Sequence, residues 1–537
     1  MPKMKMYINW RLLRTGFFDW RLNYAGIFLL MLGYYGWLQR VPYIGDPDGF
    51  YHAKMAVFLR QGIILKSLPW MQFSTLRDHF TDHHLLYHIL LAPFTLIQDN
   101  PLLGVKIAAI VFAAIMVTVF YWLLKKLDIA WPAWLTLLFV TLSGLNFRLA
   151  LIKVSPLSIL VVWLLIYALY KEKNWLTFAL GFIFVWLYGG WPIALMVLLA
   201  YLLAEKIYIF IHQKKINLLH KKIVLALPFA HKSKAYFRQS LALISGLVAG
   251  LIVNPYFPTN LYFYYQQFVQ IGVINMGNKF SVGEEWYGAN FGQVVSVAPH
   301  IFALACVLFV ILFYNHRRIS RLTIFSFGLT FVFLFLTMKS RRYLEYYSPF
   351  LLLYAATALN DVKNAISWKK MNKFWDSLAW YVRTYLAITV LFFCILAMPK
   401  IYEQALNTAI NKRLPLNQFA GAANWLKNNT PAHSLVFHTD WDEWPMLFYF
   451  NDQNYYMVGL DFTFMYNYSP ELQKEYIDIT TNQMPEPLAK KIKQDFGASY
   501  IFIEKMDRDN LIKKLETDPD MSRVYNDEKT SIYKINL

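Results

Sequence analysis

The chain has 537 residues, of which 57% are hydrophobic and 18% aromatic, and its formal net charge is +19. So many apolar residues in long runs exclude an ordinary soluble globular protein and indicate a polytopic α-helical membrane protein. Both cysteines, Cys306 and Cys394, lie within apolar segments. The sequence therefore indicates neither a disulfide framework nor a thiolate zinc site.

Apolar segments recur throughout residues 1–398, which we interpret as a transmembrane domain of about 11 to 13 spans. The candidate spans are 24–41, 102–124, 132–150, 156–170, 174–188, 191–204, 240–254, 299–315, 322–338, 344–360 and 380–398. Several are shorter than a full bilayer crossing, so their boundaries are approximate. The first follows a basic N-terminus without a small-residue cleavage site, so we interpret it as an anchor and not as a signal peptide.

Positive charge predicts how the chain is oriented. Lysines and arginines precede the first span at positions 3, 5, 11, 14 and 21. The positive-inside rule then places the N-terminus in the cytoplasm, in a plasma or inner membrane. Counting alternate loops puts further basic segments on the same side, at 125–126, 171–173, 205–239, 316–321 and 363–373. This count requires that 84–98 does not cross, which suits a short segment that contains histidines and a proline.

Three regions then share the outer face: the loops 42–101 and 255–298, and a C-terminal domain over 399–537. Within this domain SLVFHTD, NYYMVGL and SYIFIEK are typical of short strands, and 415–428 and 484–495 of helices. We therefore expect an extracytoplasmic α/β domain. Its roughly balanced charge argues against a nucleic-acid partner.

Two carboxylates, Asp46 and Asp48, follow directly on the first apolar segment. Carboxylates at the edge of a membrane helix are costly unless they hold a metal, a proton or a substrate. The alternative is that Asp-Pro-Asp-Gly forms a turn and that one aspartate caps the next helix.

A basic cluster, Lys339, Arg341 and Arg342, lies at the outer end of a predicted span, where the positive-inside rule disfavours it. Arginine pairs bidentately with phosphate, so the cluster could hold a lipid-linked phosphate. The alternative is that these side chains extend to the membrane interface as anchors.

Four short motifs follow one another along the chain: Asp48-Gly49-Phe50-Tyr51, Ser281-Val282-Gly283-Glu284, Arg341-Arg342-Tyr343 with Tyr347-Ser348-Pro349, and Asp440-Trp441-Asp442-Glu443-Trp444. In this order they resemble the first acidic motif, the SVxE motif, the donor-phosphate arginine segment and the WWDxG motif of GT-C membrane glycosyltransferases. The resemblance is to the catalytic subunit of oligosaccharyltransferase, and it covers nearly the whole chain.

The resemblance implies a membrane glycosyltransferase that moves a sugar or glycan from a polyprenyl phosphate or diphosphate to an acceptor on the outer face. It implies catalytic roles for Asp48 and Glu284, beside which we place Asp46. It also implies that Arg341 or Arg342 binds the donor phosphate. The predicted acceptor-binding residues are Asp440, Trp441, Asp442 and Trp444.

The chain departs from the family at the second acidic motif. There it has Arg148-Leu-Ala-Leu-Ile-Lys-Val-Ser-Pro-Leu-Ser, with Ser155 and Leu157 where carboxylates are expected. A divalent metal site, for Mg or Mn, is therefore incomplete. Asp48, together with Asp82 and His83 from RDHFTDHH, is a candidate ligand, although that segment can equally be an ordinary polar interfacial loop.

The WWDxG motif has lost its first Trp and its Gly, which become Asp440 and Trp444. We therefore expect a glycan, glycolipid or protein hydroxyl as acceptor in preference to an asparagine sequon. An asparagine-linked oligosaccharyltransferase remains the alternative within the class. A transporter or flippase, which more often has charges at mid-membrane and repeated halves, and a non-catalytic relative are the alternatives outside it.

Overall fold

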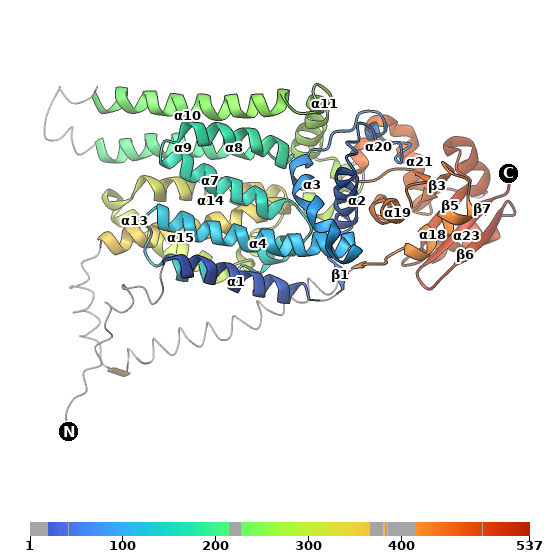
Figure 1. Cartoon of the computed structure of the whole chain (residues 1–537), viewed down its shortest axis with the longest axis horizontal. Coiled ribbons are helices and arrows are strands. Elements are labelled where there is room, and N and C mark those ends of the chain that lie inside the picture. Colours follow the sequence, from blue (N-terminus) through green and yellow to red (C-terminus); the bar gives the residue numbers. More distant parts are fainter. Residues whose placement is uncertain are drawn as a thin grey trace.

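A bundle of long helices is joined at one end to a smaller C-terminal domain (Figure 1). The computed structural model describes residues 20–40, 42–213, 227–365, 380–381, 384, 414–485 and 487–537. The long helices of the bundle lie side by side along the long axis of the molecule. They are α1 Trp20–Leu38, α4 Pro101–Lys126, α7 Ser155–Tyr170, α8 Asn174–Leu187, α9 Ile193–Gln213, α10 Leu227–Ile252, α13 Pro299–Tyr314, α14 Arg321–Lys339 and α15 Leu344–Ala365.

Within the described residues, four helices are long and apolar enough to cross a membrane: Pro101–Lys126, Ile193–His212, Lys234–Ile252 and Arg321–Lys339. A bent pair, Pro132–Thr141 and Gly144–Ala150, would make a fifth span. Several of the other candidates form apolar helices of 10–17 residues. The chain is therefore a mostly helical membrane protein, and the count of 11 to 13 spans stays a prediction. The candidate span 380–398 lies almost entirely outside the described residues.

Glycines allow two bundle helices to approach closely. A side-chain carbon at Gly246 of α10 would lie 2.2 Å from the backbone oxygen of Phe178 in α8. One at Gly181 of α8 would lie 2.9 Å from the backbone oxygen of Leu243. Small residues at such a contact let backbones pack directly, which is a common way to join helices in a membrane.

Shorter helices complete this part of the chain. They are α2 Asp48–Arg60, α3 Leu85–Leu91, α5 Pro132–Leu137, α6 Ser143–Ala150, α11 Thr259–Tyr265 and α12 Phe291–Ser296. Figure 1 shows α2 and α3 at the end of the bundle that faces the domain. The segment 84–98 thus forms α3 and the helical turns η2, Ala92–Asp99, each shorter than a bilayer crossing.

The C-terminal domain contains a five-stranded mixed sheet with strand order β4-β3-β5-β7-β6. Its strands are β3 Leu435–His438, β4 Tyr455–Tyr456, β5 Tyr500–Glu504, β6 Met521–Asn526 and β7 Thr530–Ile535. β3 pairs in parallel with β4 and β5, and β7 pairs antiparallel with β5 and β6. The helices of the domain are α18 Ala420–Asn429, α19 Trp444–Phe450, α20 Phe462–Tyr468, α21 Pro470–Thr480, α22 Leu488–Lys491 and α23 Asp509–Thr517.

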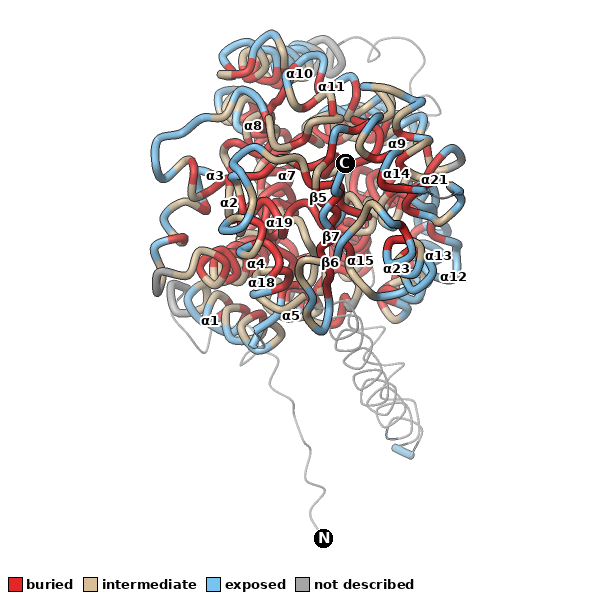
Figure 2. Tube along the Cα trace, turned by 90° about the vertical axis from the view of Figure 1, so that its right-hand side faces the viewer, coloured by how far each residue is buried: buried red, intermediate tan, exposed pale blue. Residues whose placement is uncertain are grey.

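Several contacts fix this domain to the end of the bundle. β1 (Tyr43–Ile44), just after α1, pairs antiparallel with β2 (Leu414–Pro415) at the start of the domain. Lys54 of α2 forms a 2.9 Å ion pair with Asp452. Figure 2, which looks onto this end, shows buried chain in the middle and exposed chain at the rim. Buried apolar side chains of the bundle and of the domain form one continuous cluster, so the two parts share one interior.

Candidate functional site

A cavity of about 1180 Å³ lies where the helical bundle meets the C-terminal domain. Its bundle wall is formed by the start of α2, the loop between α6 and α7, and the helical turns η6 (Glu284–Trp286) and η8 (Arg341–Tyr343). Its other wall is formed by η9 (Trp441–Glu443), the start of α20 and the end of β5. Seven segments that are far apart in the sequence thus line one cavity.

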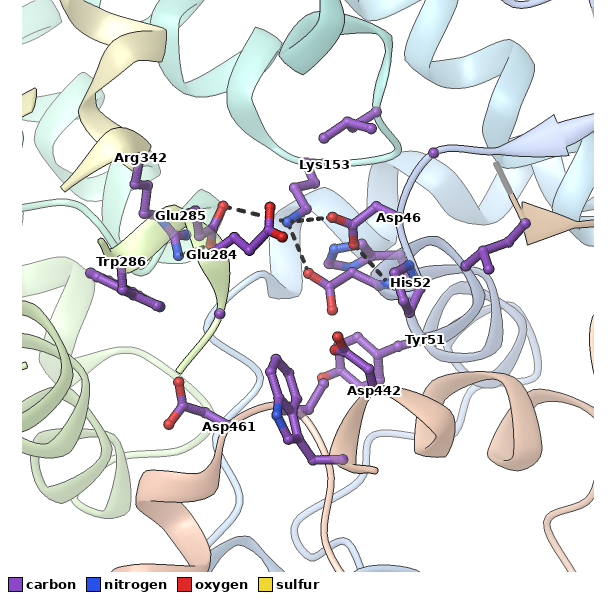
Figure 3. Close-up of a pocket in the computed structure, with 18 of the residues that line it drawn as sticks. Asp46, Tyr51, His52, Lys153, Glu284, Glu285, Trp286, Arg342, Asp442 and Asp461 are labelled. Atoms are coloured by element: carbon purple, nitrogen blue, oxygen red, sulfur yellow. Dashed lines mark hydrogen bonds and ion pairs between the residues drawn. The ribbon is translucent and has the colours of Figure 1, made fainter. Parts of the chain in front are cut away.

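Lys153, in the loop between α6 and α7, contacts several carboxylates at once. Its Nζ lies 3.0 Å from Asp46 Oδ2, 3.1 Å from Asp48 Oδ2 and 3.7 Å from Glu285 Oε2. The lysine side chain is only 14% exposed. Figure 3 shows it between Asp46 and Glu285, with Asp442 and Asp461 on the opposite wall. Sequence reasoning did not include this lysine among the site residues.

Glu285 connects the lysine to two arginines. Arg148 Nη2 lies 2.9 Å from Glu285 Oε2, and Arg342 Nη1 lies 2.9 Å from Glu285 Oε1. Arg148 Nε also lies 3.1 Å from Glu345 Oε2, which accepts a 2.6 Å hydrogen bond from Ser155 Oγ. Charge-assisted pairs of this kind hold both partners in a defined orientation. The network therefore fixes α6, η6 and η8 relative to one another.

The carboxyl groups around Lys153 differ in their pKa. Burial raises the pKa of Asp46 to about 6, although Lys153 opposes the change. Burial also favours the neutral form of Glu285, but Lys153, Arg342 and Arg148 outweigh it and hold the pKa of that carboxyl well below its usual value. Burial would lower the pKa of Lys153, and its carboxylate neighbours raise it instead. The lysine is therefore charged at neutral pH, and so is Glu285.

The predicted catalytic residues Asp46, Asp48 and Glu284 all line the cavity. Asp46 also stabilises the turn that the sequence offered as its alternative role, because its Oδ1 accepts a 2.9 Å hydrogen bond from Asp48 N. Glu284 is exposed at the cavity wall. The neighbouring Glu285, which was not predicted, forms ion pairs with Arg148 and Arg342. The motif similarity selected the first glutamate, and only the contacts reveal the second.

The two predicted phosphate-binding arginines both line the cavity, in different surroundings. Arg342 pairs with Glu285, and its guanidinium lies 5.1 Å from the centre of the Trp286 ring. Arg341 has a buried Nε without a hydrogen-bond partner among the described residues. An unsatisfied buried donor at a cavity wall is suited to an anionic ligand.

The predicted acceptor residues divide into two pairs. Trp441 and Asp442 line the cavity, and burial raises the pKa of Asp442, with Asp440, Asp48 and Asp46 adding to the effect. Asp440 caps η9, and its Oδ2 lies 3.6 Å from Arg508 Nη2. Trp444 is fully buried and stacks on Phe448 with ring centres 4.6 Å apart. Direct contact with a ligand in the cavity is thus open to Trp441 and Asp442.

The candidate metal ligands are not brought together. Asp82 is buried and lies 2.8 Å from His88 Nδ1, and His88 Nε2 lies 2.7 Å from His52 Nδ1. His83 lines the cavity, while Asp48 is held by Lys153. Among the described residues, no three His, Cys, Asp or Glu side chains form a group that could hold a metal ion. The residues present therefore do not fit the divalent site that the resemblance suggests.

Comparison with known proteins places this architecture among solved structures. No family model matches the chain, and no curated protein matches it in sequence. The apo oligosaccharyltransferase of Archaeoglobus fulgidus superposes with a TM-score of 0.58 at 11% identity, over 90% of this chain and 69% of its own. At such identity the match shows a shared fold.

Two other transferases have the same fold. ArnT from Cupriavidus metallidurans, solved with undecaprenyl phosphate, superposes with a TM-score of 0.52 at 13% identity, over 96% of this chain and 98% of its own. The mycobacterial arabinofuranosyltransferase AftD gives 0.53 at 11% identity, over 96% of this chain but 40% of its own. The chain therefore has the GT-C fold and resembles oligosaccharyltransferase, as the sequence motifs predicted.

Proposed function

We propose that this protein is an integral-membrane glycosyltransferase that transfers a sugar or glycan from a polyprenyl phosphate or diphosphate to an acceptor at the outer membrane face. The observation that carries the proposal is a single cavity that brings carboxylates and arginines together at the end of a GT-C helical bundle. Dolichol phosphate and undecaprenyl phosphate are bound to two of the structural neighbours. In this proposal the N-terminus is cytoplasmic and the C-terminal domain extracytoplasmic.

The cavity offers the groups that such a transfer needs. Glycosyl transfer passes through an oxocarbenium-like state while negative charge develops on the departing phosphate. Arg341, whose Nε has no partner among the residues that the structure describes, would bind that phosphate. Asp48 would accept the proton of the acceptor as the new bond forms. The ring of Trp441, at the cavity wall, provides a face for sugars to stack on.

A panel of labelled polyprenyl-linked donors, incubated with the purified full-length protein, tests this function. Asp48→Asn keeps the size of the side chain and removes its charge, so we expect transfer to fall by roughly 10²-fold or more. Asp509→Asn, at an exposed position in α23, is the matched control and should transfer at the wild-type rate. Near-normal transfer by a well-folded Asp48→Asn protein would refute the role of Asp48 and favour Asp46.

The acceptor is proposed to be a hydroxyl of a glycan, glycolipid or protein side chain. Trp441 and Asp442 combine an aromatic face with a carboxylate, which suits hydroxyl-rich molecules. Asparagine-linked transfer is the second candidate, because one neighbour was solved with a tethered acceptor peptide containing the NVT sequon. An Asn-Xaa-Thr peptide assayed beside lipid-linked and polysaccharide acceptors separates the two. Efficient, Thr-dependent modification of the peptide would favour the second candidate.

A further inference from the structure

We propose that the ammonium group of Lys153 takes the position and the charge of a divalent cation in this centre, so that glycosyl transfer here does not depend on a metal ion. The inference rests on the proposed function, because it concerns how that transfer is achieved. It starts from a departure in the sequence. Carboxylates were expected near Ser155 and Leu157, and the same loop instead carries a lysine.

Three carboxylates surround the ammonium group of this lysine, as they would surround a bound metal cation. Asp46, Asp48 and Glu285 come from two different segments, and all three direct a carboxylate oxygen to within 3.7 Å of its Nζ. A side chain that is 14% exposed and surrounded in this way has little freedom to move away. Without a central positive charge, the three carboxylates would repel one another in a partly buried site.

The carboxylate oxygens are already engaged, which leaves few ligands for a metal. Asp46 accepts from Lys153 and from the backbone N–H of Asp48. Glu285 accepts from Arg148 and Arg342 through its two oxygens. A hard divalent cation needs about six oxygen ligands. It would also meet the ammonium charge at close range, so the two cations compete for one position.

In the proposed transfer, the bond between the anomeric carbon and the phosphate oxygen breaks with its electron pair, which leaves on the phosphate. The bond between the acceptor oxygen and the anomeric carbon forms, and the acceptor proton passes to the Asp48 carboxylate. The phosphate charge is met by the Arg341 guanidinium and the Lys153 ammonium, so no external oxidant or further reactant is needed.

The first experiment uses the wild-type protein after chelation of bound metals. We expect the transfer rate to change less than twofold between EDTA and millimolar Mg²⁺ or Mn²⁺. Thermal unfolding monitored with and without Mn²⁺ gives a readout apart from activity, and we expect no shift. Loss of transfer in EDTA with recovery in Mn²⁺, or a Mn²⁺-dependent rise in Tm that Asp48→Asn abolishes, would overturn the inference.

The second experiment changes the lysine. Lys153→Met keeps the bulk of the side chain but removes its charge, and we expect a loss of transfer of roughly 10²-fold. Lys279→Met, in the outer loop and outside the cavity wall, is the matched control. Wild-type transfer by Lys153→Met would overturn the inference.

Lys153→Asp tests whether a metal ion can occupy the position of the Lys153 ammonium group, and this test does not require transfer activity. It would place another carboxylate beside Asp46 and Asp48, so Mn²⁺ should raise its Tm while leaving the wild-type Tm unchanged. A folded Lys153→Asp protein whose Tm does not rise with Mn²⁺ would contradict the proposal that the Lys153 ammonium takes the position of a divalent cation. If no donor supports transfer under any condition, the proposed function fails, and this Mn²⁺ comparison still decides the role of Lys153.

Discussion

Arg341 and Arg342 are adjacent in the chain, yet their surroundings predict different effects of mutation. Arg342 is held by Glu285 and lies over Trp286, whereas Arg341 lies at the cavity wall with an Nε that no described residue pairs with. Arg341→Ala should therefore weaken donor binding by about 10-fold or more, consistent with the loss of a charge-assisted hydrogen bond, with little change in Tm.

Arg342→Ala should lower Tm as well as transfer, because it leaves the half-buried Glu285 carboxylate with fewer partners. Titration of each variant with a lipid-linked donor, alongside thermal unfolding, separates the two roles. If neither alanine variant changes donor affinity, the arginines are interfacial anchors, which was the alternative at the sequence level.

Glu504, at the end of β5, gives stability a dependence on pH. Burial raises its pKa to about 7 from a usual 4.5, with Glu443 and Asp440 adding to the effect. The folded protein therefore binds more protons than the unfolded chain between these values. The contribution of this carboxyl to stability falls as pH rises from 4.5 to 7.

Glu504→Gln should remove this contribution to the pH dependence of stability. The Tm of the variant, relative to that of the wild type, should therefore be higher at pH 8 than at pH 5. Melting curves at both pH values, with Glu471→Gln at an exposed position as control, measure it. A variant with the same pH slope as the wild type would show that Glu504 titrates normally.

At the scale of elements, the contact between α8 and α10 depends on Gly246. A methyl group there would meet the backbone oxygen of Phe178 at 2.2 Å, and a backbone atom cannot turn aside as a side chain can. Gly246→Ala should therefore push the helices apart and destabilise the protein by roughly 1–3 kcal/mol.

Gly328→Ala in α14 is the matched control, because nothing lies within 4 Å of its added carbon. It should leave Tm unchanged or raise it slightly, since alanine favours a helix over glycine. Thermal unfolding in detergent compares the two variants, and equal melting temperatures would mean that the α8–α10 contact tolerates expansion.

The elements that sequence reasoning found are those with a strong local signal. The predicted strands SLVFHTD, NYYMVGL and SYIFIEK contain β3, β4 and β5, because buried apolar runs of this length are recognisable. β6 and β7 were missed. β6 has no buried residue, so its sequence carries no clear alternation. The predicted boundary between residues 398 and 399 lies outside the described residues, so it stays a prediction, as does the number of spans.

At the scale of the whole molecule, the site shows why local patterns were not sufficient. Asp46 and Asp48 were predicted because two carboxylates next to an apolar segment are unusual in themselves. Lys153 and Glu285 have no such signal, since a lysine in a loop and the second of two glutamates are ordinary locally. Their importance comes from a fold that brings the carboxylates of Asp46 and Glu285 within 4 Å of the Lys153 ammonium group.

The charge distribution of the whole molecule predicts its orientation in the membrane. The exposed basic turn η7, His316–Arg318, precedes α14, and the cavity wall η8 follows it, so one helix separates the two. If basic loops remain in the cytoplasm, the cavity and the C-terminal domain must lie outside.

Single cysteines at Arg317 and Asn428, both exposed, test this in a background with Cys306 and Cys394 replaced by serine. A membrane-impermeant thiol reagent added to intact cells should label position 428 and spare position 317, and permeabilised cells should be labelled at both. The reverse pattern would place the cavity on the cytoplasmic side. A donor presented from the outer leaflet could then not reach Arg341, because a polyprenyl phosphate does not cross a bilayer readily with its charged head group.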